Sequence, residues 1–146
     1  MIQGGREMSI YADHCVLKIE RRTTPGETEA QVTAELQAIL DELSAEDPAF
    51  RATLRVLIAR APFVVDEDAP IVQILDETLR QRLGVRQPHI GQPFWTDAAL
   101  LSEAGMDTVI LGPIGAGLHS AVEWVDLASV VDLAAMLAET AWRYCT

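Results

Sequence analysis

Residues 108–138 read TVILGPIGAGLHSAVEWVDLASVVDLAAMLA, and this stretch is the clearest indication of the fold class. Its first four residues form a continuous apolar run, which is typical of a strand buried on both faces. Three glycines follow between residues 112 and 117, so a loop is expected there. Asp126 then predicts the N-cap of a last helix. The stripe that this helix is expected to turn toward the core consists of Leu127, Val130, Val131, Ala134, Leu137 and Ala141.

The rest of the second half also predicts helices between extended segments. A helix is expected from Pro70 to about Leu83, with Asp68 as its N-cap and Gly84 just after its end. A short helix is expected to begin at residues 96–97 and to end near Gly105. Alternation of this kind predicts an α/β layer.

The first half predicts a strand, a helix and a second strand. Residues 15–19 place apolar side chains at alternate positions, as a half-buried strand does. Thr28 and Gln31 have the spacing of a capping box, and Asp47-Pro48 is expected to end the helix that follows. Residues 52–60 alternate again and predict the second strand. The apolar face of the helix is expected to comprise Val32, Leu36, Ile39, Leu40 and Leu43.

Composition excludes several classes of protein. The chain has 146 residues, of which 49% are apolar, so it is long enough to bury a core. Acidic residues outnumber basic ones 22 to 11, and the net charge of −11 argues against nucleic acid or a membrane surface as a partner. No stretch has the length of a membrane span, and the first 15 residues contain no secretory apolar core. We therefore expect a cytoplasmic protein in which Cys15 and Cys145 are buried, reduced thiols.

The segment 112–123 holds the side chains most suggestive of chemistry. It brings His119 and Glu123 to the carboxyl end of the expected strand, where open α/β sheets bind ligands. The Lys-Ser/Thr ending of a phosphate loop is absent, and a single histidine does not make the two-histidine zinc helix. From the residues alone, His119 is either a metal ligand or proton carrier, or a loop histidine bonded to its own backbone.

Two other pairs each allow a functional and a structural interpretation. Thr96 and Asp97 make a good helix start, which is a sufficient reason for their presence. Arg21 and Arg22 form a possible fork for a substrate carboxylate, although solvated surface arginines are commoner. No cysteine, serine or histidine spacing indicates a nucleophilic enzyme, and no catalytic residue is assigned.

Two longer runs are similar to one known family. CVLKIERRTTPGETEAQVTAEL, from residue 15, resembles the lid-domain signature of the zinc hydrolases that include acetylornithine deacetylase, succinyl-diaminopimelate desuccinylase and aminoacylase. FWTDAALLSEAGMDTVILGPIGAGLHSAVEWVDLASV, from residue 94, resembles the C-terminal segment of the same family. The resemblance implies an α/β fold in two parts. Residues 1–62 would be a partial lid and dimerisation domain of order β-β-α-β, and residues 63–146 would be the C-terminal part of the catalytic domain.

The resemblance also implies roles for individual residues. His119 would bind one of two zinc ions, with Glu123 and Asp97 as supporting residues. Arg22 would reach the substrate carboxylate, although Glu20 replaces the usual aspartate beside it. The residues expected to line the substrate pocket are Thr96, Gly115 and Gly117. The family's Asn-x-x-Pro before the lid strand is absent, because Ser9 and Ala12 stand there.

The remaining metal ligands and the Glu-Glu pair of the family are missing from these 146 residues. We therefore expect a C-terminal fragment of an enzyme that cleaves an N-acyl amino acid or small peptide. This fragment is expected to form a homodimer through its lid. By itself it is expected to retain neither zinc nor activity. The alternative is a non-catalytic dimerisation or carboxylate-binding module derived from such an enzyme. A small-ligand sensor that uses Arg22 is a third hypothesis.

Overall fold

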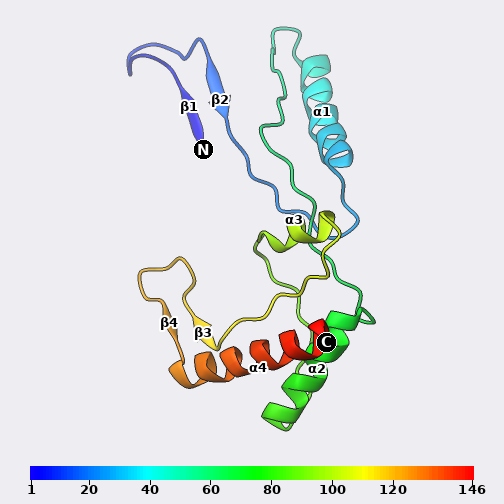
Figure 1. The fold of residues 1–146 in the computed structure, drawn as a ribbon. Coiled ribbons are helices and arrows are strands. Elements are labelled where there is room, and N and C mark those ends of the chain that lie inside the picture. The colour runs from blue at the N-terminus through cyan, green and yellow to red at the C-terminus, as the bar shows by residue number, and fades with distance from the viewer. The chain divides into compact units, whose positions relative to one another are not determined.

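The computed structural model describes residues 1–146 and contains four helices and four short strands (Figure 1). The chain divides into two compact units, Met1–Leu54 and Arg55–Thr146. Helices and two small sheets occur together, which agrees with the mixed α and β class expected from the sequence.

Unit 1 begins with a two-stranded antiparallel sheet. Strand β1 (Ile2–Gly4) pairs with β2 (Cys15–Leu17), and Ile2 lies opposite Leu17. The strand expected from residue 15 is therefore confirmed, although it ends at Leu17. All six residues of the sheet are exposed. The expected burial of Cys15 is wrong, and Cys145 is exposed as well, because neither lies against a core; both are free thiols.

Helix α1 (Glu29–Glu46) confirms the capping box. The amide of Gln31 donates to Thr28 Oγ1 at 3.2 Å, and the amide of Thr28 donates to Gln31 Oε1 at 2.9 Å. The helix ends at Asp47, as expected. Its apolar face is not buried in unit 1, since no residue of α1 is buried.

Two of the expected strands are absent. Residues 51–60 form no regular structure, and Ile58 in this segment is 71% exposed. Residues 108–111 likewise pair with no neighbouring strand. The order β-β-α of the first part is found, but its final strand is not. The physical reason is the same in both places: alternation or apolar character favours a strand, but only a neighbouring segment can complete its hydrogen bonds.

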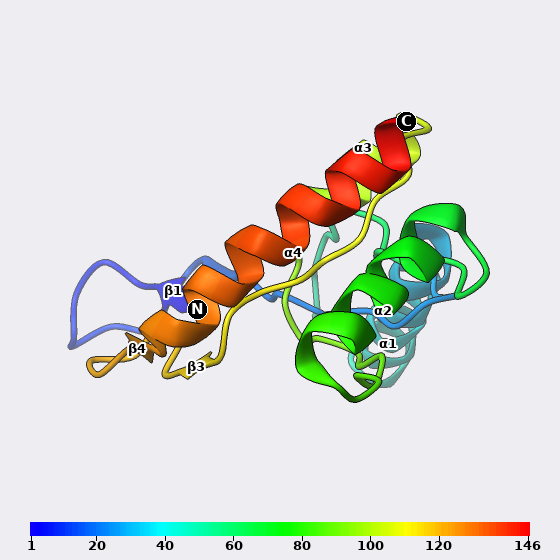
Figure 2. The same ribbon diagram turned by 60° about the horizontal axis from the view of Figure 1, so that its bottom comes forward.

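The core of unit 2 lies between helix α2 (Pro70–Leu83) and helix α4 (Leu127–Cys145), which pack against each other (Figure 2). Leu75 and Leu79 of α2 meet Met136 of α4, and all three side chains are buried. The partly buried residues packed against this cluster are Val109, Leu111 and Leu133. Residues 108–111 are therefore held by their side chains rather than by a sheet.

Helix α2 has the expected ends but a different N-cap. Pro70 occupies the first turn, and Gly84 follows the helix with φ of 75° in the left-handed region. The N-cap is Ala69, not Asp68, and no side chain caps this end. The amide of Asp68 instead donates to Asp66 Oδ1 at 2.9 Å, so a turn over residues 66–69 shifts the helix start by one residue.

Helix α4 begins as expected, because Asp126 Oδ1 accepts a hydrogen bond from the amide of Ser129 at 2.9 Å. The expected core stripe is wrong, however: all six of its residues are exposed. The face that packs on α2 carries Met136 and Thr140 instead. Since α4 is apolar on most of its circumference, periodicity could not distinguish the face toward α2 from the opposite one.

Polar side chains link α2 to α4 around this core. Arg82 Nε donates to Asp132 Oδ1 at 3.0 Å, and Arg143 Nη2 donates to Gln81 Oε1 at 2.6 Å. Within α2, the Arg80 guanidinium and the Gln81 amide lower the pKa of Glu77 to about 2. These groups are exposed to solvent, so they orient the helices rather than provide most of the stability.

Two threonine hydroxyls are buried without a hydrogen-bond partner, Thr78 in α2 and Thr140 in α4. A buried hydroxyl that lacks a partner loses the hydrogen bonds it makes to water in the unfolded chain. We expect Thr78→Val to raise the free energy of unfolding of unit 2 by about 1 kcal/mol. Urea unfolding followed by circular dichroism measures this. Thr33→Val, at a half-exposed position of α1, is the matched control. If Thr78→Val lowered the free energy of unfolding instead, the Thr78 hydroxyl would be hydrogen-bonded in solution.

No helix in the structure combines the length and apolar character needed to cross a lipid bilayer.

Candidate functional site

The loop that carries His119 and Glu123 connects two short strands in unit 2. Strand β3 (Gly115–Ala116) pairs antiparallel with β4 (Trp124–Val125), and residues 117–123 join them. The hairpin is fixed to the start of α4 at its base: the amide of Ile114 donates to Ser129 Oγ at 2.9 Å. The glycine-rich segment is thus a hairpin beside a helix N-terminus, not the loop that follows a buried parallel strand.

Backbone conformation in this loop depends on Gly117. Its φ is +82°, and a Cβ at this position would lie 2.0 Å from the carbonyl oxygen of Val122. The amide of Ser120 donates to the carbonyl of Gly117 at 2.8 Å and closes the turn. His119 lies within it and has φ of 60°, the single left-handed non-glycine residue of the chain. A non-glycine residue in this region is uncommon and marks a tightly constrained turn.

The His119 side chain is exposed and makes no hydrogen bond or ion pair. A loop histidine bonded to its own backbone is therefore not what the structure shows. Glu123 is exposed as well. No group of three or more His, Cys, Asp or Glu side chains is arranged to hold a metal ion. Since a hydrolytic zinc site needs about three protein ligands, the residues present do not make one by themselves.

Thr96 and Asp97 lie at the start of helix α3 (Ala98–Glu103). Thr96 Oγ1 accepts a hydrogen bond from the amide of Ala98 at 3.3 Å, so Thr96 has the structural role expected of a helix start. Asp97 stands at the N-cap position, but its side chain makes no capping bond. No hydrogen bond or ion pair joins either residue to His119. The assignment of Thr96 to a substrate pocket and of Asp97 to a supporting role stays a prediction.

The two neighbouring arginines of unit 1 differ in their contacts. The Arg21 guanidinium bonds Glu27 at 2.5 Å and also Glu35. The Thr24 amide and the Arg21 guanidinium lower the pKa of Glu27. Arg22 Nε lies 3.0 Å from Glu20 Oε1, and both side chains are largely exposed. Arg21 therefore pairs with two carboxylates of unit 1, whereas Arg22 pairs with Glu20, two residues before it.

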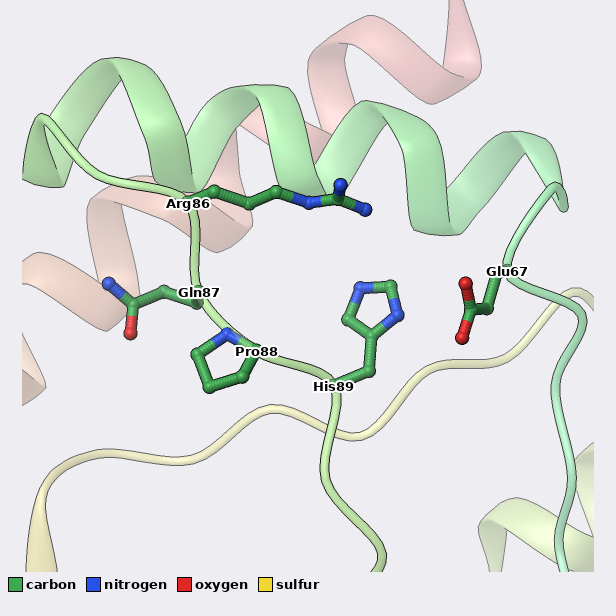
Figure 3. A pocket seen from close by; sticks show the side chains of 5 residues that line it. All are labelled: Glu67, Arg86, Gln87, Pro88 and His89. Carbon is green, nitrogen blue, oxygen red and sulfur yellow. The ribbon is translucent and has the colours of Figure 1, made fainter.

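A cavity lies elsewhere in unit 2, beneath α2 (Figure 3). Its volume is about 390 Å³, and its lining residues are Glu67, Arg86, Gln87, Pro88 and His89. His89 and Glu67 point toward each other across it (Figure 3). The Nε2 atom of His89 lies 2.9 Å from Asp76 Oδ1, and Arg86 Nη2 lies 3.4 Å from Asp76 Oδ2. None of the sequence-predicted site residues lines this cavity.

No pattern in the sequence indicates the Asp76–His89 pair. The two residues are 13 positions apart, Asp76 on α2 and His89 in the segment after it, so no motif spacing connects them. Their bond holds that segment against the helix.

Comparison with known proteins shows the family of this chain. Residues 2–143 match the model of the peptidase family M20/M25/M40. The chain belongs to this family. The resemblance inferred from the lid-like and C-terminal runs is thereby confirmed. Enzymes of the M20 family are generally metal-dependent.

Among curated proteins, the M20 chain is similar to an acetylornithine deacetylase of Myxococcus xanthus. The two are 29% identical over 146 residues, which is 99% of this chain and 37% of that protein. The chain therefore spans little more than a third of the length of this relative. No solved structure matches the chain.

Proposed function

We propose that these 146 residues are the C-terminal portion of a zinc-dependent hydrolase that cleaves the amide bond of an N-acyl amino acid or small peptide. In this proposal residues 1–62 are a partial lid and dimerisation domain, and residues 63–146 belong to the catalytic domain. The observation that carries this proposal is that the chain matches 37% of the length of an acetylornithine deacetylase. Within that part, His119 is the one candidate metal ligand, and no group of three potential ligands is present. The chain alone is then inactive.

Each site residue has a role within this proposal. His119 contributes one ligand to the metal site, and residues outside these 146 contribute the other ligands and the general base. A guanidinium fork binds carboxylate in bidentate fashion, so Arg22 holds the substrate carboxylate after releasing Glu20. Thr96, Gly115 and Gly117 line the pocket, supported by Asp97 and Glu123. No step of the reaction is assigned to the chain alone, because its residues do not complete a metal site.

The dimer and the compartment are further parts of the proposal. Helix α1 has no buried residue, and Ile39 and Leu43 of its apolar face are exposed. A second lid packed on this face would bury them, which supports a homodimer. Two free thiols that form no disulfide support a cytoplasmic location.

The alternative is a non-catalytic module that dimerises through the lid or binds a carboxylate through Arg22. The surroundings of His119 favour it, because no other potential metal ligand is grouped with this exposed histidine. The proposals differ in one respect: in the alternative, adding the missing part of an M20 enzyme does not produce hydrolysis.

We expect the purified chain to show no hydrolysis of N-acetylornithine with or without added zinc, because one ligand does not hold a hydrolytic zinc ion. The assay measures released ornithine, with the Myxococcus xanthus deacetylase as the positive control. His119→Ala is expected to give the same null result. Zinc-dependent turnover by the chain that disappears in His119→Ala would overturn the proposal of an inactive portion.

A further inference from the structure

Side chains of opposite charge line the cavity beneath α2 without pairing with each other. The carboxylate of Glu67 makes no hydrogen bond or ion pair, and it faces His89 across the cavity (Figure 3). The Arg86 guanidinium extends beneath α2 toward the same space, and its contact within the chain is with Asp76 at 3.4 Å (Figure 3). A carboxylate and a guanidinium that share a cavity in this way are both available to a ligand.

Asp76 fixes the orientation of His89 and determines which of its ring nitrogens is available. The Asp76 side chain is 14% exposed, and its Oδ1 atom lies 2.9 Å from His89 Nε2. An ionised carboxylate only accepts hydrogen bonds, so Nε2 carries the proton and Nδ1 of the neutral imidazole has a lone pair. The second ring nitrogen is on the side that faces Glu67 (Figure 3). His89 Nδ1 and the Glu67 carboxylate are therefore two acceptors directed at the same part of the cavity.

This arrangement of acceptors and donors fits a zwitterion. An ammonium group donates three hydrogen bonds, which suits the acceptors of His89 and Glu67. A guanidinium binds a carboxylate through two parallel hydrogen bonds, which suits Arg86. A ligand with an anionic group alone is disfavoured by Glu67 and by the net charge of −11. A metal ion is disfavoured as well, because no group of three ligands is present and Arg86 contacts the same carboxylate as His89.

We propose that this cavity binds the zwitterion of a free α-amino acid, with its ammonium group between Glu67 and His89 and its carboxylate on Arg86. The volume of about 390 Å³ lies within the roughly 300–1,000 Å³ of small-molecule sites. Asp76 is a positioning residue in this site, because it contacts both His89 and Arg86. The inference goes beyond the proposed function, since it uses none of the residues that have a role there.

The experiment titrates the complete 146-residue chain with L-alanine at neutral pH and follows the backbone amide signals of Arg86, Gln87 and His89 by NMR. Two matched probes each lack one charge: N-acetyl-L-alanine has no ammonium group, and L-alaninamide has no carboxylate. We expect saturable shifts with L-alanine in the millimolar range. Both derivatives should bind at least tenfold more weakly, because each loses hydrogen bonds between charged groups.

Variants assign each charge of the ligand to its partner. Glu67→Gln should bind L-alanine at least tenfold more weakly, and the preference for L-alanine over N-acetyl-L-alanine should disappear. Arg86→Gln should in the same way remove the preference over L-alaninamide. Asp68→Asn is the matched control and should bind L-alanine normally, because it removes a charge from an exposed side chain next to Glu67 that does not line the cavity. Circular dichroism checks that α2 and α4 stay helical in every variant.

Four results would overturn the inference. The first is the absence of saturable shifts with L-alanine. Equal binding of L-alaninamide would make the cavity a site for amines, and equal binding of N-acetyl-L-alanine would make it a site for anions. The fourth is an equal loss of binding in Asp68→Asn and Glu67→Gln, which would mean that the overall charge of the segment, and not the Glu67 carboxylate, attracts the ligand.

Discussion

Leu79→Ala is expected to lower the free energy of unfolding of unit 2 by about 2–5 kcal/mol. Leu79 is 5% exposed and packs with Leu75 and Met136 in the cluster that joins α2 to α4. Truncation to alanine removes apolar contacts and leaves a cavity that a core of so few residues has little means to fill. Because native domains are stable by only about 5–15 kcal/mol, the loss threatens the fold of the whole unit.

Urea unfolding followed by far-UV circular dichroism measures this loss. Leu83→Ala is the matched control, since Leu83 belongs to the same helix but is 40% exposed. Leu83→Ala should lower the free energy of unfolding by well under half as much as Leu79→Ala does. Equal effects of the two substitutions would mean that the α2–α4 cluster is not the core of unit 2 in solution.

Gly117→Ala is expected to break the pairing of β3 with β4 while leaving helices α2 and α4 intact. The new Cβ would lie 2.0 Å from the carbonyl oxygen of Val122, and φ of +82° is unfavourable for alanine. Backbone strain of this kind costs about 1–3 kcal/mol, which is large for a hairpin with two paired residues on each strand. The loop that carries His119 should therefore rearrange.

Amide chemical shifts and hydrogen exchange at Gly115 and Val125, which lie opposite each other, report on this pairing. Gly112→Ala is the control, because no heavy atom lies within 4 Å of the position that its Cβ would take and its φ is not left-handed. If Gly117→Ala kept the native shifts of β3 and β4, the left-handed turn at Gly117 would not be present in solution. A native turn in Gly112→Ala is required for the comparison.

The geometry of Gly117 also bears on its proposed role in the substrate pocket. The close approach of Val122 and the left-handed φ require glycine here whether or not a ligand is present. Thr96 likewise has a structural role without a ligand, because its hydroxyl accepts a hydrogen bond from the amide of Ala98 at the start of α3. For both residues the local structural requirement is sufficient, so variants at Arg22 and His119 test the proposed site more directly.

Features that depend on a few neighbouring residues could be predicted from the sequence. The capping box of Thr28 and Gln31, the left-handed Gly84 after α2 and the Asp126 cap of α4 are all present. Each is a hydrogen bond or a backbone preference that is complete within about one helical turn. The family resemblance depended on local runs of residues in the same way and is confirmed.

Features that need a partner from elsewhere were decided by tertiary structure. Residues 52–60 and 108–111 have strand-like patterns but no neighbour to pair with, so neither forms a ladder. Helix α4 is apolar on opposite sides, and the position of α2 determines that Met136 rather than Val131 is buried. Sequence by itself determined to within about two residues where the helices of this protein begin and end, because caps and turns act within a few residues. Which faces are buried and which strands pair was left to tertiary structure, because burial and strand hydrogen bonds both require a second surface.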